Sequence, residues 1–237
     1  MTKPLSSLTP NIDKRLAAWD GIRKHLAAQK QIVVRPTVTI SREFGCEGYQ
    51  VAERVQTLMA EATGEPWNVY DKALLEAVAS EQGIDMHTLR NLGDTARSFE
   101  KFGLRPPEYL QHAEAFRAVA EKLVSFAAIG NAVIVGRGGA VLCSQLPNCF
   151  HFRIEASLAC RVAGIAKRLE LSAEDAKALV EANTKLRNTF LQEQLHVDHR
   201  DRGFFHAIFN NDLAPADLIA EAIVGFVKKA WKSRSTP

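Results

Sequence analysis

The sequence has few cysteines, no long apolar run and little net charge. Its four cysteines form no CxxC pair, and their spacing indicates neither a zinc site nor a disulfide framework: Cys46, Cys143, Cys149 and Cys160. No run of about 18 apolar residues is present, and the N-terminus lacks the pattern of a signal peptide. The formal charge of +3, with scattered Lys and Arg, argues against nucleic-acid binding. We expect a soluble, cytoplasmic protein with reduced thiols and neither nucleic-acid nor membrane partners.

The 237 residues suffice for one domain with an extension. Ile12, Leu16, Trp19 and Leu26 recur at helical spacing, which predicts an amphipathic helix over residues 11–30. We therefore expect an N-terminal extension at residues 1–31 and a main domain at 32–237. The apolar stripe of this helix could pack on the core or on a second copy of the chain, in a homodimer.

Strand-like and helix-like segments alternate along the main domain. Strands are predicted at residues 32–40, 69–70, 132–136, 149–156 and 204–209. Helical patterns cover residues 51–64, most of 72–129, 157–195 and 215–231, and the inner face of the last is predicted to carry Leu218, Ile219, Ala222, Ile223 and Phe226. Continuous apolar runs such as Val-Ile-Val suit strands buried on both faces of a parallel sheet. The sequence therefore predicts a three-layer α/β/α fold with a parallel sheet.

The segment VTISREFGCEGYQVAERV, residues 38–55, has the layout of a phosphate-binding loop. Such a loop follows a strand, and its backbone N–H groups surround phosphate oxygens at a helix N-terminus. Gly45 and Gly48 would permit the tight turn and the close approach of a phosphate. The alternative is a strand-to-helix turn that binds no ligand.

The loop lacks the side chains that normally complete it. Tyr49 and Gln50 stand in place of the lysine and the serine or threonine, and Glu47 adds a negative charge where phosphates would lie. Arg42 is the nearby cation, and it could replace the missing lysine. These residues alone leave open whether the segment binds a nucleotide.

Four motifs in order resemble the cytidylate kinase-like family, P-loop relatives of the nucleoside monophosphate kinases. They are ISREFG-x-x-G, VYDKALLEAVASEQGI, IVGRGG and FHFRIEASLACR, and the similarity extends from about residue 37 to 229. The resemblance implies a P-loop NTPase fold with a helical insertion at about 72–130 and a lid at about 165–203. It also implies transfer of the γ-phosphoryl group of ATP, with Mg²⁺, to a nucleoside monophosphate or similar small phosphorylated acceptor.

The resemblance also implies roles for individual residues. Nucleotide phosphates would be bound by Ser41, Gly45, Cys46, Glu47, Gly48, Tyr49 and Gln50. The acceptor would be bound by Asp71, Lys72, Gly136 and Arg137. Since phosphoryl transfer needs positive charge around the transferred group, the candidate catalytic residues are Arg42, Arg137, Arg161 and Arg187.

Simpler roles remain open for several of these side chains. Arg137 could be a surface arginine in a glycine turn, and Asp71 could cap the following helix. Arg161 and Arg187 could lie on solvated helix faces. The altered loop also leaves a second hypothesis, a nucleotide-binding or sensor protein with little turnover and an interaction role.

Two further segments carry polar clusters. His196, Asp198, His199, Asp201 and His206 match no metal-binding spacing, and we assign no protein metal site there. Asn210, Asn211 and Asp212 precede the last helix, where helix capping is the first expectation and contact with the donor base the second.

Overall fold

The computed structural model describes residues 3, 34–71, 108–198 and 200–235. The predicted N-terminal helix, Lys72, His199 and most of the predicted insertion lie outside these residues.

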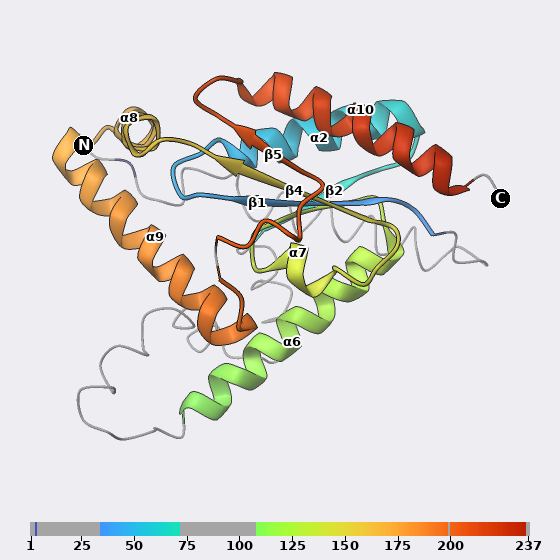
Figure 1. Ribbon diagram of the computed structural model, residues 1–237, viewed down its shortest axis with the longest axis horizontal. Helices are drawn as coiled ribbons and strands as arrows, with labels where there is room; N and C mark the ends of the chain where they lie inside the picture. The colour runs from blue at the N-terminus through green and yellow to red at the C-terminus, as the bar shows by residue number, and fades with distance from the viewer. Residues whose placement is uncertain (1–2, 4–33, 72–107, 199, 236–237) are drawn as a thin grey trace.

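A five-stranded, all-parallel sheet forms the centre of the described structure (Figure 1). Its strands are β1 (Thr37–Arg42), β2 (Asn68–Tyr70), β3 (Ala132–Val135), β4 (Cys149–Glu155) and β5 (Ala207–Asn210). Their order across the sheet is β2-β3-β1-β4-β5, so β1 lies in the middle and its carboxyl end is flanked by those of β3 and β4. In such sheets, ligands bind outside the carboxyl ends of the strands.

Helices cover both faces of the sheet and one of its ends. They are α2 (Gly48–Thr63), α6 (Glu108–Ile129), α7 (Gly139–Leu142), α8 (Leu158–Leu169), α9 (Ala173–Leu195) and α10 (Ala216–Ser235). Figure 1 shows α2 and α10 on one face, α6 and α7 on the other, and α8 with α9 at the end of the sheet. The predicted three-layer α/β/α arrangement with a parallel sheet is confirmed. No described helix is both long and apolar enough to span a membrane.

Helix α2 follows the predicted pattern closely. Val51, Val55 and Met59 are buried against the sheet, as their spacing indicated. The helix ends at Gly64, which adopts the left-handed conformation (φ 68°), and the Gly64 N–H donates to the carbonyl oxygen of Ala60. The strand-turn-helix context required for a phosphate-binding loop is therefore present.

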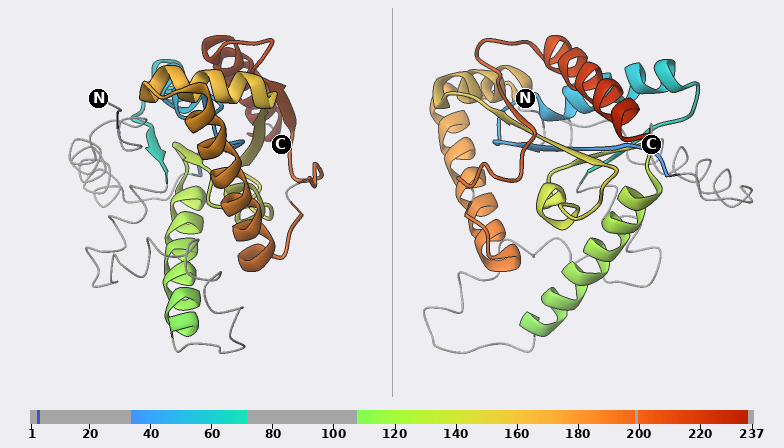
Figure 2. Two further views of the ribbon diagram at one scale, coloured as in Figure 1. Left: turned by 90° about the vertical axis from the view of Figure 1, so that its left-hand side faces the viewer. Right: turned by 45° about the vertical axis from the view of Figure 1, so that its right-hand side comes forward.

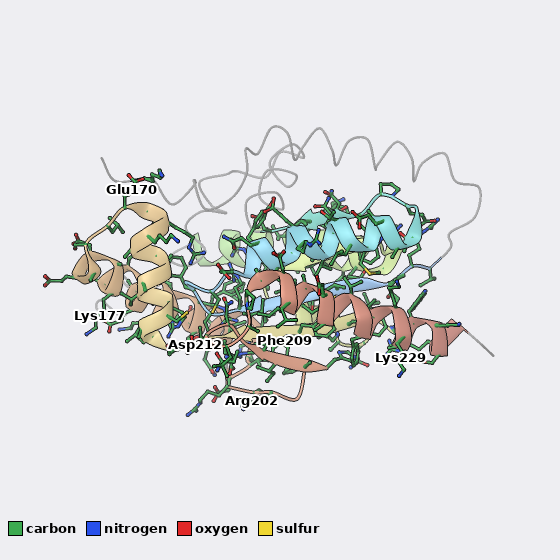
Figure 3. The ribbon with its side chains drawn as sticks, turned by 90° about the horizontal axis from the view of Figure 1, so that it is seen from above. Glu170, Lys177, Arg202, Phe209, Asp212 and Lys229 are labelled. Atoms are coloured by element: carbon green, nitrogen blue, oxygen red, sulfur yellow. The ribbon has the colours of Figure 1, made fainter. Side chains whose placement is uncertain are left out.

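The segment predicted as one helix, 157–195, forms two. Helix α8 ends at Glu170, which has a left-handed φ of 57°, and α9 begins after Ser172. The Ser172 hydroxyl accepts the Asp175 N–H at 3.1 Å and so caps α9. This corner turns α9 away from the sheet, and Figure 3 shows Glu170 and Lys177 at the same end of the molecule.

The inner face predicted for the last helix was partly wrong. Ile219, Ile223 and Val227 are fully buried, together with Ala220 and, almost fully, Val224. Leu218 and Ala222 are instead exposed. Phe226 is 40% exposed, but its ring meets that of Phe152 in β4 with 5.6 Å between ring centres, so it does contact the sheet as predicted. The face that contacts the sheet is rotated by about one residue from the predicted stripe, because α10 also packs against α2. The last strand also differs, since it begins at residue 207 and not at 204.

Candidate functional site

The loop between β1 and α2 is held in a shape that only glycine allows at Gly45. Its φ is +102°, and an added Cβ would lie 2.6 Å from the Cβ of Arg161. The neighbouring Cys46 is buried, and this burial raises the pKa of its thiol to about 12. Cys46 is therefore a neutral packing residue in this loop and not a nucleophile.

Arg42 extends from the end of β1 across the carboxyl edge of the sheet. Near its base, an added Cβ on Gly48 would lie only 2.8 Å from the Arg42 Cγ. At its tip, an added Cβ on Gly136 would lie 2.7 Å from the Arg42 Nη1. The side chain thus runs past the first residue of α2 and ends beside the turn that follows β3. This path joins the loop to the predicted acceptor residues.

The Arg42 guanidinium lies among several charges. Burial lowers its pKa, the negative charge of Asp71 opposes this, and the positive charge of Arg137 lowers it further. The side chain of Asp71 is itself buried at the end of β2. Three residues predicted from separate motifs, Arg42, Asp71 and Arg137, are therefore brought together by the parallel sheet.

Arg187 on α9 completes the positive group. Burial, followed by the charges of Arg42 and Arg153, lowers its pKa to about 9, and Glu43 partly opposes this. The guanidinium remains protonated at neutral pH. Within the described part of the chain, neither Arg42 nor Arg187 takes part in a hydrogen bond or an ion pair. Two desolvated cations whose charge is only partly offset by Asp71 and Glu43 favour binding of an anion beside them.

Arg137 lies in a turn with an unusual backbone. Gly136, Arg137 and Gly138 have φ values of 76°, 50° and 69°, so three successive residues are in the left-handed region. The guanidinium carbon of Arg137 lies 5.4 Å from the centre of the Phe190 ring on α9. Arg137 is thus half-buried at the end of β3 and contacted by α9.

Arg161, on α8, connects the glycine loop to α9 through hydrogen bonds. Its Nη1 donates to the carbonyl oxygen of Phe44 at 3.3 Å and to the Thr184 hydroxyl at 3.2 Å. Its Nε donates to the carbonyl oxygen of Ala156 at 3.2 Å and lies 3.5 Å from the Glu43 carboxylate. Hydrogen bonds within the protein thus use much of the donor capacity of the Arg161 guanidinium. A role in holding the loop against α8 and α9 follows from these contacts, beside the predicted role at the phosphates.

The other side of the loop is joined to the segment after β5. The Asn211 Oδ1 accepts the Glu47 N–H at 2.9 Å, and its Nδ2 donates to the Glu47 carboxylate at 3.3 Å. Arg168 donates to the carbonyl oxygen of Gly45. Asp212 accepts the Ser157 N–H at 3.1 Å, and Figure 3 shows Asp212 on the side of the molecule where α8 lies. The first expectation for this cluster was capping of the last helix, whereas these contacts join it to Glu47, the residue before α2, and to the start of α8.

Sequence reasoning missed Arg153. This arginine is buried near the carboxyl end of β4, and its Nε lies 2.7 Å from the Glu155 carboxylate, which also accepts from Arg202 at 3.2 Å. Its positive charge contributes to the lowered pKa of Arg187. The available signal was a charged residue inside the apolar strand FHFRIE. Such a residue lies near the carboxyl edge of the parallel sheet, where ligands bind.

The remaining predicted residues lie around this centre. Ser41 is buried at the end of β1, and Tyr49 packs against the hydrophobic core between the sheet, α2 and α10. Gln50 is half-buried in the first turn of α2. An open groove of about 420 Å³ separates the start of α8 from α9, and it is lined by Leu158, Arg161, Glu181, Thr184, Lys185, Asn188 and Thr189.

The residues fit a magnesium ion that arrives with a nucleotide. Such ions take most of their ligands from phosphates and water and one or two from protein carboxylates. Glu43 already accepts the Ala156 N–H at 3.2 Å and lies beside Arg161. Asp71, buried at the end of β2 near Arg42, is a second carboxylate at this edge of the sheet.

The sequence model described as the cytidylate kinase-like family matches residues 37–213. An uncharacterized protein from Eubacterium ventriosum has a similar structure, with a TM-score of 0.57 and 20% identity over 82% of this chain and 99% of that one. The shikimate kinase from Bacteroides thetaiotaomicron gives a TM-score of 0.43 and 11% identity over 83% of this chain and 98% of its own. A comparison with curated protein sequences gave no significant match.

Proposed function

The chain belongs to the cytidylate kinase-like family, and we propose that it transfers the γ-phosphoryl group of ATP to a nucleoside monophosphate or a similar small phosphorylated acceptor. The observation that supports this most is the pair Arg42 and Arg187. Both guanidiniums are desolvated, neither has an ion-pair partner among the described residues, and they lie between the glycine loop and the turn after β3. A phosphoryl group in transfer between donor and acceptor would lie at this position and would neutralise them.

In this proposal each charged group has one task. The loop around Gly45 binds the donor phosphates, Arg137 binds the acceptor phosphate, and Arg42 with Arg187 contacts the transferred group. An acceptor phosphate oxygen attacks the γ-phosphorus, the bond from that phosphorus to the bridging oxygen breaks, and ADP leaves. Mg²⁺, held by the phosphates and Asp71, would supply further charge neutralisation. Catalysis then consists of positioning and electrostatic stabilisation, and no covalent enzyme intermediate is needed.

A weakly catalytic nucleotide sensor is the second candidate. One observation favours it: the chain itself already engages the Glu47 N–H through Asn211 and the Gly45 carbonyl oxygen through Arg168. A phosphate at this loop would have to displace or share the first of these contacts. The carboxylate of Glu47 also opposes phosphate binding. Nucleotide binding without turnover would support this candidate over the kinase.

The proposal is tested first by ligand binding and then by turnover. We expect ATP with Mg²⁺ and one nucleoside monophosphate to raise the melting temperature, and the same pair to produce ADP. Arg137→Ala should abolish turnover and leave the melting temperature of the free protein within a few degrees. Arg200→Ala is the matched control, because Arg200 is exposed and pairs only with Asp198 at 2.7 Å among the described residues. Binding of neither nucleotide at millimolar concentration would contradict the proposal.

A further inference from the structure

Helix α9 contacts the site through three successive positions. Thr184 accepts a hydrogen bond from Arg161 on the donor side, Arg187 lies beside Arg42 in the middle, and Phe190 lies against Arg137 on the acceptor side. The three positions are three residues apart, so they follow one another along neighbouring turns of the helix. Figures 1 and 2 show α9 running from the end of the sheet toward α6. One helix therefore touches both halves of the site.

Phe190 is the part of α9 that contacts the acceptor turn. Its ring is nearly buried, at 8% exposure, and it meets Phe116 of α6 edge-on with 5.4 Å between ring centres. Leu195, one turn and a half further along α9, packs so closely on Gly138 that an added Cβ there would lie 2.1 Å from the Leu195 Cδ1. The turn that carries Arg137 is thus covered by two apolar side chains of the lid helix.

The Phe190–Arg137 contact is compatible with binding of phosphate by the arginine. A guanidinium donates its N–H groups within its own plane, whereas it contacts an aromatic ring through its face. At 5.4 Å from the ring centre, Arg137 is within cation–π range of Phe190. A ring in this position restricts the orientation of the side chain. Holding a binding group in its bound orientation increases affinity for the ligand.

We infer that Phe190 is a positioning residue for the acceptor site: its ring orients Arg137 toward the phosphate of the acceptor. The inference rests on the proposed function, because it assigns a role within the same site. It also defines a chemical requirement. Any apolar side chain of suitable size could fill the space beside Phe116, but only an aromatic ring adds the attraction of its π face for a cation.

The test is a double-mutant cycle on anion binding, with inorganic pyrophosphate as the probe and isothermal titration calorimetry at constant ionic strength as the measurement. Phe190→Leu keeps an apolar side chain and removes the ring, and Phe190→Met serves if that variant does not fold. We expect the Kd for pyrophosphate to rise about three- to tenfold in Phe190→Leu, the range of a partly desolvated cation–π contact. Phe190→Tyr should restore the Kd to within about twofold, since it keeps the ring.

The Arg137→Ala background decides whether the effect passes through Arg137. There, Phe190→Leu should cause no further loss, because the side chain that it positions is gone. An equal loss in both backgrounds, an unchanged Kd in Phe190→Leu, or no pyrophosphate binding by the unaltered protein would overturn the inference. Anion binding needs no turnover, so a protein that binds pyrophosphate as expected and yet transfers no phosphoryl group would contradict the proposed function alone.

Discussion

The side chain of Arg42 occupies the space that any side chain at Gly48 would need. An added Cβ on Gly48 would approach three carbon atoms of Arg42 at 2.8, 2.9 and 3.3 Å. These atoms belong to the base of the arginine, so they have little freedom to move aside. The path of the Arg42 side chain therefore requires a glycine at the first position of α2. With glycine there, the Arg42 guanidinium can lie beside Gly136.

Gly48→Ala should displace Arg42 and weaken ATP binding. We expect a loss of about 1–3 kcal/mol in the free energy of unfolding, the usual cost of overpacking a tight contact. The Kd for ATP with Mg²⁺ should rise, measured by calorimetry. Gly225→Ala is the control, because no atom lies within 4 Å of an added Cβ there and alanine favours the interior of α10. Equal effects of the two substitutions would contradict this account.

Glu47→Gln should tighten ATP binding. The substitution removes the negative charge from the loop and keeps an oxygen that can accept from Asn211. We expect the Kd for ATP to fall about two- to fivefold at low salt and the difference to shrink as salt screens it. Glu221→Gln, on the exposed side of α10, should leave the Kd unchanged. A weaker affinity in Glu47→Gln would show that the carboxylate supports the loop more than it repels phosphate.

Binding of sulfate, an anion whose charge does not change in this pH range, should weaken in alkaline solution. Arg187 has its pKa lowered to about 9 by burial and by the charges of Arg42 and Arg153, so its positive charge is lost as the pH rises through that value. The affinity measured by calorimetry should therefore decrease over about one pH unit on either side of 9. In Arg187→Gln the affinity should be lower at neutral pH and should lack this alkaline decrease. A flat profile for the unaltered protein would contradict the assignment.

Acid should destabilise the protein through His151. This side chain shares a hydrogen bond of 2.8 Å with Thr39, and burial, followed by the charges of His206 and Arg234, lowers its pKa to about 4. Because the unfolded state binds the proton at a pKa of about 6.5, the stabilisation is complete above that pH and is lost as the pH falls toward 4.

Urea unfolding between these pH values measures this loss. We expect His151→Gln to show a smaller decrease in the free energy of unfolding from pH 7 to pH 4.5 than the unaltered protein, although it is less stable at pH 7. His196→Gln is the control, since His196 is exposed at the end of α9. An unchanged decrease in His151→Gln would assign the acid sensitivity to other groups.

Local patterns in the sequence were enough for the main elements of the fold. The positions of β2, β3 and β4 agree with the predicted strands within about one residue, because short apolar runs bounded by turns carry their own signal. The break between α8 and α9 was missed, although Ser172 is a standard N-cap, because the charged residues on both sides of it continue a helical pattern.

The candidate site residues came from separate motifs, and their geometry could not be predicted. The sequence indicated Arg42, Asp71, Arg137 and Arg187, but no pattern shows that Arg42 extends to Gly136 or that Arg187 is desolvated beside it. The contact between Glu47 and Asn211 joins residues 164 positions apart. Contacts of this kind depend on which strands are neighbours, and the sequence around each residue carries no information about that.

The sequence by itself determined the class of fold, the glycine loop and the arginines that could serve it, because each depends on residues close together in the chain. The tertiary structure decided which of these side chains meet. It places the carboxyl ends of β1, β3 and β4 side by side, and it brings α9 across them. Burial at that junction desolvates Arg42 and Arg187, which form no ion pair among the described residues, and this is the basis on which we propose a phosphate site at the end of the sheet.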